Sequence, residues 1–316
     1  MDYAVVKGAT RGGSTLEWIN VKTLGEGSYG VVHLVKPIKP DLDPIFSVKS
    51  CLYQDSLSLQ KEQRILRRLV GCPYIVQCFG DTLSINEEGE VVYNLFLEYA
   101  PRGDLFDLIT KRYGGKIPEC NDRFYARMLV LGLRNIHESG YVHCDLKPEN
   151  ILVLPFDLNG LINDLKIADF GLAKQPGERV DGPPGKVNFP GTAVNMPPES
   201  VENVKISASL DIWSLGCVVL QMITGEPPWE YENLTDLAIK LFHSRNPPKI
   251  PENMSGAGKD FLMKCFARNP SERWTAAMLL NHPYLLPDLP SQTNFLHRAQ
   301  AGCHLPSMKH QTMQLN

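Results

Sequence analysis

The chain has 316 residues, 43% of them hydrophobic, and a formal net charge of −3. So small a charge argues against a broad basic surface for nucleic acid, and no apolar run approaches the length that spans a bilayer. The eight cysteines include no C-x-x-C pair, which disfavours a structural zinc site or a disulfide framework. We therefore expect a protein of the cytosol or nucleus, without nucleic-acid partners and without membrane insertion.

The first third of the chain is predicted to be rich in strands. Residues 1–15 are small and polar and are expected to form a leader before the first strand. Within residues 18–98, β-branched runs such as 31–35 and 45–49 are separated by turn residues, as is typical of strands. One helix is expected in this region, over about residues 56–70. One face of it carries, at helical spacing, Leu59, Glu62, Leu66 and Leu69.

Helices are predicted to dominate after Gly103. Asp104 suits the N-cap of a short helix, and a long amphipathic helix is expected to end near Gly140. A second long helix, 211–224, is apolar all round and should therefore be buried. Gly225 is expected to end it.

Glycines recur between two predicted strands, in Gly25-Glu26-Gly27-Ser28-Tyr29-Gly30-Val31-Val32. Without a Cβ atom, glycine lets backbone N–H groups approach phosphate oxygens. On its own such a motif fits either a dinucleotide site or a tight hairpin. Because a strand rather than a helix is expected after Gly30, we favour a hairpin over nucleotide phosphates.

Lys49 ends the strand that follows this hairpin, from where its ammonium group could reach nucleotide phosphates. A lysine in that role needs an anion to hold it, and Glu62 on the predicted helix is the best candidate. Taken singly, each residue would be interpreted as a surface charge, since Glu62 lies in the charged run 61–64.

The stretch richest in chemistry is His143-Cys144-Asp145-Leu146-Lys147-Pro148-Glu149-Asn150. Phosphoryl transfer needs a carboxylate that accepts the proton of the hydroxyl nucleophile, and cations that offset charge. Asp145 suits the first task and Lys147 the second, while Asn150 offers a neutral oxygen to Mg²⁺. Asp169, in Asp169-Phe170-Gly171 after a short predicted strand, would be the principal Mg²⁺ ligand. The competing interpretation, a set of ordinary polar turns, does not explain the whole ordered set.

Together these motifs resemble those of eukaryotic protein kinases over residues 18–286. Further matching positions, in order, are Pro198-Glu199, Asp211–Gly216 and Arg273. The resemblance implies an α+β, bilobal protein-kinase fold with ATP in the cleft. The kinase domain would cover 16–287, with a β-rich N-lobe (16–98) and a helical C-lobe (101–287), and a tail would follow (288–316).

The resemblance also implies roles for single residues. Asp145 and Lys147 would be catalytic, and Asn150 and Asp169 would bind the metal. The residues implied to bind ATP are Leu24, Gly25, Gly27, Gly30, Val32, Lys49, Glu62, Glu98 and Ala100. The side-chain contacts that it implies are Glu199 with Arg273, Asp211 with the catalytic loop (residues 143–150), and Thr192 with Asp145 and Lys147.

Lys147-Pro148-Glu149 resembles the serine/threonine branch of the family. Strings such as Glu17-Trp18-Ile19 and Val142-His143-Cys144-Asp145 resemble plant MAP kinase kinase kinases of the MEKK-like type, which implies MAP kinase kinases as substrates. Two alternatives stay open: a Ser/Thr kinase outside a MAP kinase cascade, and a pseudokinase scaffold. The scaffold is disfavoured because five residues that it need not keep are all present: Lys49, Glu62, Asp145, Asn150 and Asp169.

Three positions depart from the family pattern. Ser47 replaces an alanine, a small change for ATP binding, and Asn195 replaces an aromatic residue beneath the substrate-docking loop. Cys144 replaces an arginine that in many kinases binds a phosphate on the activation segment, and no Ser, Thr or Tyr lies between Asp169 and Gly191. We hypothesise activity that does not depend on phosphorylation of this segment. Oxidant sensitivity through Cys144 is a second hypothesis, less favoured than an inert thiol.

Overall fold

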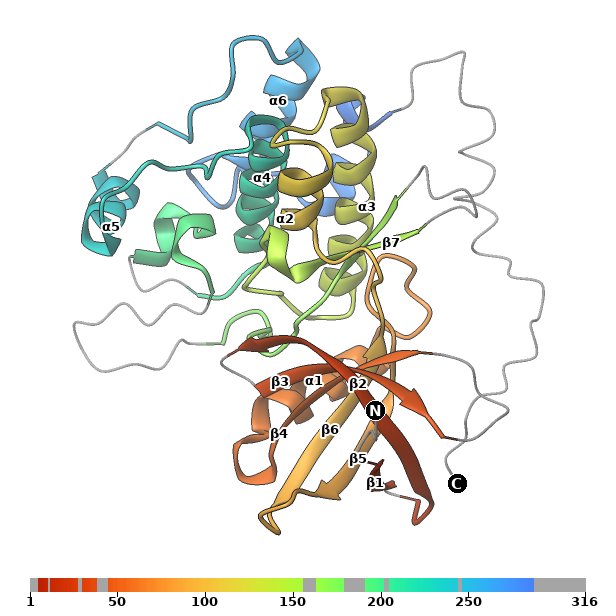
Figure 1. The fold of residues 1–316 in the computed structure, drawn as a ribbon. Coiled ribbons are helices and arrows are strands. Elements are labelled where there is room, and N and C mark those ends of the chain that lie inside the picture. The colour runs from red at the N-terminus through yellow and green to blue at the C-terminus, as the bar shows by residue number, and fades with distance from the viewer. Residues whose placement is uncertain are drawn as a thin grey trace. The chain divides into compact units, whose positions relative to one another are not determined.

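The computed structural model describes residues 5–10, 12–27, 30–38, 45–155, 163–178, 191–201, 205–243 and 246–286. These residues form two units (Figure 1), the first within 1–71 and 76–100 and the second within 72–75 and 101–287. The predicted tail, 288–316, lies outside the described residues. None of the helices in the described ranges has the length and hydropathy of a membrane span.

The first unit is a closed barrel of six strands, in which every neighbouring pair is antiparallel. The strands are Val5–Thr10 (β1), Thr15–Gly27 (β2), Gly30–Pro37 (β3), Phe46–Leu52 (β4), Cys78–Ile85 (β5) and Val91–Glu98 (β6). Their order is β1-β2-β3-β4-β6-β5, and pairing of β1 with β5 closes the barrel. The 3-10 turn Tyr53–Asp55 (η1) and the helix Leu57–Arg68 (α1) connect β4 to β5.

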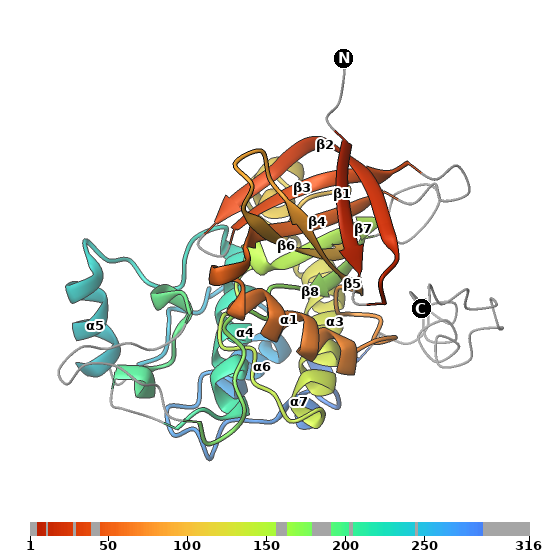
Figure 2. The same cartoon turned by 90° about the horizontal axis from the view of Figure 1, so that it is seen from below.

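Strand β1 corrects the prediction that residues 1–15 are a leader before the first strand. It pairs with β2 through Val6 and Trp18 and with β5 through Gly8 and Ser84 (Figure 2). Gly8 permits this close approach, because a Cβ atom there would lie 2.8 Å from the Trp18 ring. Small residues such as Gly8 have little strand preference of their own, so pairing along both edges decides the conformation.

The barrel core surrounds Trp18, of which 1% is exposed. It packs with Val35, Phe46, Val48 and Phe96, and it meets Phe96 edge to face with ring centroids 5.1 Å apart. β-branched and aromatic residues suit a barrel because their stiff side chains fill its interior.

Helix α1 confirms the helix predicted from spacing over 56–70. It buries Leu59, Glu62 and Leu66 and packs against β5. Leu69, the next residue of the predicted face, is the C-cap and is also buried.

The second unit is mostly helical. Its α-helices are Leu105–Asp107 (α2), Glu119–Glu138 (α3), Ala208–Thr224 (α4), Leu234–His243 (α5), Gly256–Cys265 (α6) and Ala276–Leu279 (α7). Shorter turns are the π-helical Leu108–Arg112 (η2) and the 3-10 helices Pro148–Asn150 (η3), Ala193–Asn195 (η4), Pro198–Val201 (η5) and Pro283–Leu285 (η6). The strands Ile151–Pro155 (β7) and Asn163–Ile167 (β8) form an antiparallel pair.

Helix α4 is the buried centre of this unit and packs against α3 and α6. Its residues are buried almost all round, as the apolar sequence predicts, and Gly225 caps its end with a φ of 77°. The predicted N-cap is also confirmed, since the Asp104 side chain accepts a hydrogen bond from the backbone N–H of Asp107 at 2.8 Å.

Candidate active site

The glycine-rich hairpin of β2 and β3 forms as predicted. Gly27 pairs with Gly30, and Gly25 pairs with Val32. Among the described residues, no atom beyond the adjacent residues lies within 4 Å of the place that a Cβ atom of Gly25 or Gly27 would take, so a ligand can approach their backbone. Leu24 precedes the hairpin turn and is 38% exposed. The intervening Ser28-Tyr29 lies outside the described residues.

The predicted ion pair between Lys49 on β4 and Glu62 on α1 is present. The lysine Nζ lies 3.1 Å from the glutamate Oε2, and the residues are 8% and 1% exposed. Buried charges are costly unless they are paired, which explains how a glutamate occupies the core-facing side of α1. Val32 pairs with Lys49 across β3 and β4, so the ion pair lies beside the hairpin.

Ser47 contacts the backbone that leads out of β6. Its hydroxyl donates hydrogen bonds to the carbonyls of Leu97 at 3.3 Å and Glu98 at 3.0 Å, contacts that an alanine could not make. The N–H of Glu98 donates to the carbonyl of Gln77 at 2.9 Å. The backbone expected to contact adenine is therefore held in place from two sides at Glu98, and Ala100 is partly exposed.

The second unit gathers three polar side chains around the Asp145 carboxylate. Its Oδ1 accepts hydrogen bonds from the backbone N–H and the hydroxyl of Thr192, both at 2.8 Å. Its Oδ2 lies 3.2 Å from the Lys147 ammonium and 3.0 Å from the Asn150 amide nitrogen. Lys147 also donates to the Thr192 hydroxyl at 2.9 Å. The contacts implied for Thr192 with Asp145 and Lys147 are thus confirmed.

Gly191 makes the approach of Thr192 possible. Its φ is 112°, a conformation that side chains rarely adopt, and a Cβ atom would overlap the carbonyl oxygen of Cys144. Only a glycine therefore lets the chain pass the catalytic loop closely enough for Thr192 to reach Asp145.

Asn150 and Asp169 provide oxygen atoms of the kind that magnesium prefers. Asn150 donates through Nδ2 to the backbone carbonyl of Asp145 at 2.9 Å as well as to its carboxylate, which directs the amide oxygen to other partners. Asp169 follows β8 with a φ of 62°, and its carboxylate accepts from the Gly171 N–H at 3.3 Å. A carboxylate and an amide oxygen are hard ligands, so this donor set fits Mg²⁺.

Asp211 on α4 holds the backbone of the catalytic loop, as implied. Its carboxylate accepts from the N–H groups of His143 at 2.8 Å and Cys144 at 2.9 Å, and from the His137 ring at 2.8 Å. Burial pushes the pKa of Asp211 up, but the hydrogen bond from His137 and the charges of His137 and His143 outweigh it and leave the pKa lowered. The ionised carboxylate thereby stabilises Cys144 at its positive φ of 67°.

Two histidines of this site were not predicted. His143 is fully buried, its Nε2 lies 2.9 Å from the Ala168 carbonyl, and its ring meets Phe170 edge to face. It therefore connects the catalytic loop to the segment that carries Asp169. The place of His143 at the start of the catalytic loop could have identified it from the sequence as a residue of the site. No feature of the sequence could have identified His137 on α3 in this way.

Cys144 lies in apolar surroundings. It is 8% exposed and packs with Val142, Ile206 and Leu210. This side chain thus supports the loop by packing, in the position where an arginine would carry a charge.

Glu199 and Arg273 form the implied ion pair with two contacts, at 2.7 and 3.2 Å. The guanidinium also lies over the Trp213 ring, 5.1 Å from its centroid. The pair is buried and joins the segment after Met196 to the end of the domain.

A family model described as the protein kinase domain matches residues 18–285 of the chain. The chain belongs to the protein kinase family. Mitogen-activated protein kinase kinase kinase 20 of Arabidopsis thaliana is 39% identical to this kinase over 285 residues, which cover 87% of the kinase and 80% of the relative. Numbers 17 and 18 of the same plant are each 37% identical, over 85% and 86% of the kinase and 70% and 78% of the relatives. This kinase is accordingly a serine/threonine protein kinase of the MAP kinase kinase kinase type.

Proposed function

We propose that this kinase uses ATP and Mg²⁺ to phosphorylate MAP kinase kinases on serine and threonine. The names of the similar plant kinases support this substrate class. The observation that carries the proposal is the arrangement around Asp145, where Thr192, Lys147 and Asn150 all contact one carboxylate.

Asp145 and Lys147 perform the transfer in this proposal. The Asp145 carboxylate orients the substrate hydroxyl and accepts its proton, while the hydrogen bonds from Thr192 keep the carboxylate aimed. Lys147, within 3.2 Å of that carboxylate, offsets the charge of the transferred phosphoryl group.

The remaining predicted residues bind ATP and metal. The backbone of the hairpin at Gly25, Gly27 and Gly30 contacts phosphate oxygens, with Leu24 and Val32 beside the base, and Lys49 contacts the phosphates while Glu62 holds it. The backbone of Glu98 and Ala100 contacts adenine. Asn150 and Asp169 hold Mg²⁺, which when bound neutralises charge on the phosphates.

We further propose that the kinase domain extends to residue 287, with an N-lobe that runs from β1 to residue 98, a C-lobe at 101–287 and a tail at 288–316. We also propose that the protein works in the cytosol or nucleus. The eight cysteines without a C-x-x-C pair support a reducing compartment. Imaging of a fluorescent fusion in plant cells tests the location, and accumulation in the secretory pathway would contradict it.

Phosphorylation of a panel of purified MAP kinase kinases tests the substrate class. Each panel member carries an inactivating change, so that only this kinase can act, and the Lys49→Met variant is the control. We expect phosphate on serine or threonine of at least one panel member, at a rate well above that for a generic basic protein. Equal rates for all acceptors would favour a kinase outside a MAP kinase cascade.

A further inference from the structure

Asn195 occupies a position where an aromatic residue is more usual, yet its side chain is not at the surface. Only 4% of the residue is exposed. It ends η4, where its backbone N–H donates to the Thr192 carbonyl at 3.0 Å. A buried carboxamide therefore lies three residues beyond the threonine that holds Asp145.

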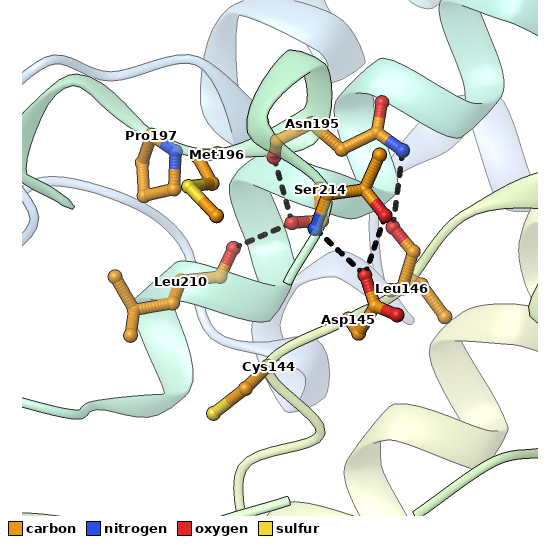
Figure 3. Close-up of a pocket in the computed structure, with 9 residues that line it drawn as sticks. Cys144, Asp145, Leu146, Asn195, Met196, Pro197, Leu210 and Ser214 are labelled. Atoms are coloured by element: carbon orange, nitrogen blue, oxygen red, sulfur yellow. Dashed lines mark hydrogen bonds between the residues drawn. The ribbon is translucent and has the colours of Figure 1, made fainter. Parts of the chain in front are cut away.

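The side chain and backbone of Asn195 contact two other elements (Figure 3). Its Nδ2 donates to the carbonyl of Leu146 at 3.4 Å. Its own carbonyl accepts from the Ser214 hydroxyl of α4 at 2.9 Å. Leu146 separates Asp145 from Lys147, so the carbonyl that Asn195 contacts lies between the two residues proposed to perform the transfer.

The carboxamide contributes little to stability, because one of its two polar atoms is unsatisfied. Among the described residues, its Oδ1 has no hydrogen-bond partner. A buried acceptor without a partner costs free energy that an apolar side chain of the same size avoids. The smallness of Asn195 and Cys144 also leaves a cavity of about 10 Å³ between them, Met196 and Leu210, roughly the space of one water.

We propose that Asn195 is a positioning residue for phosphoryl transfer. By donating a hydrogen bond to the Leu146 carbonyl, it keeps the Asp145 carboxylate and the Lys147 ammonium at fixed positions relative to the segment that follows Thr192. It replaces the packing of an aromatic ring with a hydrogen bond at the centre of the catalytic loop. The proposal rests on the kinase activity alone and not on the choice of MAP kinase kinases as substrates.

Steady-state kinetics of Asn195→Leu with a generic basic protein acceptor test this role. We expect kcat to fall about tenfold, the effect of one lost hydrogen bond. The KM for ATP should stay the same and the melting temperature should not fall. Asn281→Leu is the matched control, because the Asn281 amide also donates to a carbonyl, at 3.2 Å, but on the exposed end of α7. Its kcat should equal that of the wild type.

Asn195→Asp adds a readout that a purely structural role would not move. Burial at this position, of which only 4% is exposed, should raise the pKa of the introduced carboxyl well above its ordinary value. A protonated carboxyl can donate to the Leu146 carbonyl and an ionised one cannot, so kcat relative to wild type should recover as the pH falls from 8 to 6. Asn195→Leu should show no such recovery. The proposal would be overturned if Asn195→Leu kept the wild-type kcat, or if its loss of kcat only followed a lower melting temperature. It would also be overturned if the pH profile of kcat in Asn195→Asp ran parallel to that of the wild type.

Discussion

Glu62 is a charged residue on the core-facing side of α1, and only 1% of it is exposed. Its helical spacing with Leu59 and Leu66 placed it on this face, and the position of Lys49 identified its partner. Hydrogen bonds such as those of Asn195 and His143 were beyond prediction, because they depend on backbone atoms brought close only by the fold. For Asn195, the expectation of a lost aromatic anchor missed the contact with Leu146.

Glu62→Gln should destabilise the kinase, because it leaves the Lys49 ammonium buried without its carboxylate. We expect the free energy of unfolding to fall by about 3 kcal/mol, and the KM for ATP to rise as Lys49 loses its fixed position. Urea denaturation and ATP kinetics measure the two effects. Glu138→Gln removes an exposed partner of Arg134 and is the control, with an expected change below about 0.5 kcal/mol. Equal losses of unfolding free energy in the two variants would show that the buried ion pair stabilises the fold no more than the exposed one.

At the scale of elements, long patterns were predictable and short ones were not. The 3.6-residue spacing of apolar residues predicted the position of α1, and the long apolar run predicted that of α4. The recurring glycines predicted the β2–β3 hairpin. Strand β1 was missed because its conformation depends on pairing with β2 and β5 rather than on its own residues.

Gly8→Val tests the contribution of β1 to the barrel. The added Cβ atom would lie 2.6 Å from the Thr82 hydroxyl and 2.8 Å from the Trp18 ring, so the strand must shift. We expect a loss of about 1–3 kcal/mol in the free energy of unfolding, measured by urea denaturation. Gly256→Ala is the control, because no non-neighbouring atom of the described part of the chain lies within 4 Å of the added Cβ atom. Unchanged stability of Gly8→Val would mean that β1 is not packed against Trp18.

The contact between α3 and η6 should make stability depend on pH. Asp122 is fully buried and accepts a hydrogen bond from the Tyr284 hydroxyl, while its Oδ1 has no partner among the described residues. Burial raises the pKa of Asp122 to about 8, against the ordinary value of 3.8, and the Glu119 charge adds to this. The folded state therefore holds a proton that the unfolded state releases, and stability falls as the pH rises from about 4 to 8, by up to about 1.4 kcal/mol per pH unit.

Asp122→Asn cannot ionise and should lose this slope, so its stability relative to wild type should increase with pH. Thermal unfolding between pH 5 and 8 measures the difference. Asp236→Asn is the control of opposite sign, because the Lys240 hydrogen bond lowers the pKa of Asp236. That group stabilises the fold above its unfolded pKa and loses this effect only at acid pH. A wild-type curve parallel to that of Asp122→Asn would contradict the prediction.

For the whole molecule, the hypothesis that activity does not depend on phosphorylation of the activation segment stays a prediction, and contacts of the described residues support it. Cys144 packs in an apolar cluster instead of offering a charge, and Lys174 lies 3.4 Å from Glu178 within its own segment. Thr192, the only hydroxyl residue between Asp169 and Glu199, is bonded to Asp145 and Lys147. A phosphate on it would place negative charge beside Asp145, which makes it unsuitable as an activating site.

Phosphatase treatment should therefore leave the specific activity of the purified kinase nearly unchanged. The measurement is phosphate incorporation into a protein acceptor before and after treatment, with mass spectrometry to locate any phosphate that is removed. A kinase that requires a phosphorylated activation segment is the positive control. A large loss of activity traced to residues 170–199 would contradict this account.

The rate of phosphoryl transfer in Asp145→Asn tests the central claim most directly. The amide keeps the size of the side chain but cannot accept the proton of the substrate hydroxyl. We predict a rate about 10²–10⁴-fold below wild type, with the melting temperature and the affinity for ATP unchanged. A rate within tenfold of wild type would contradict the assignment of Asp145 as the proton acceptor.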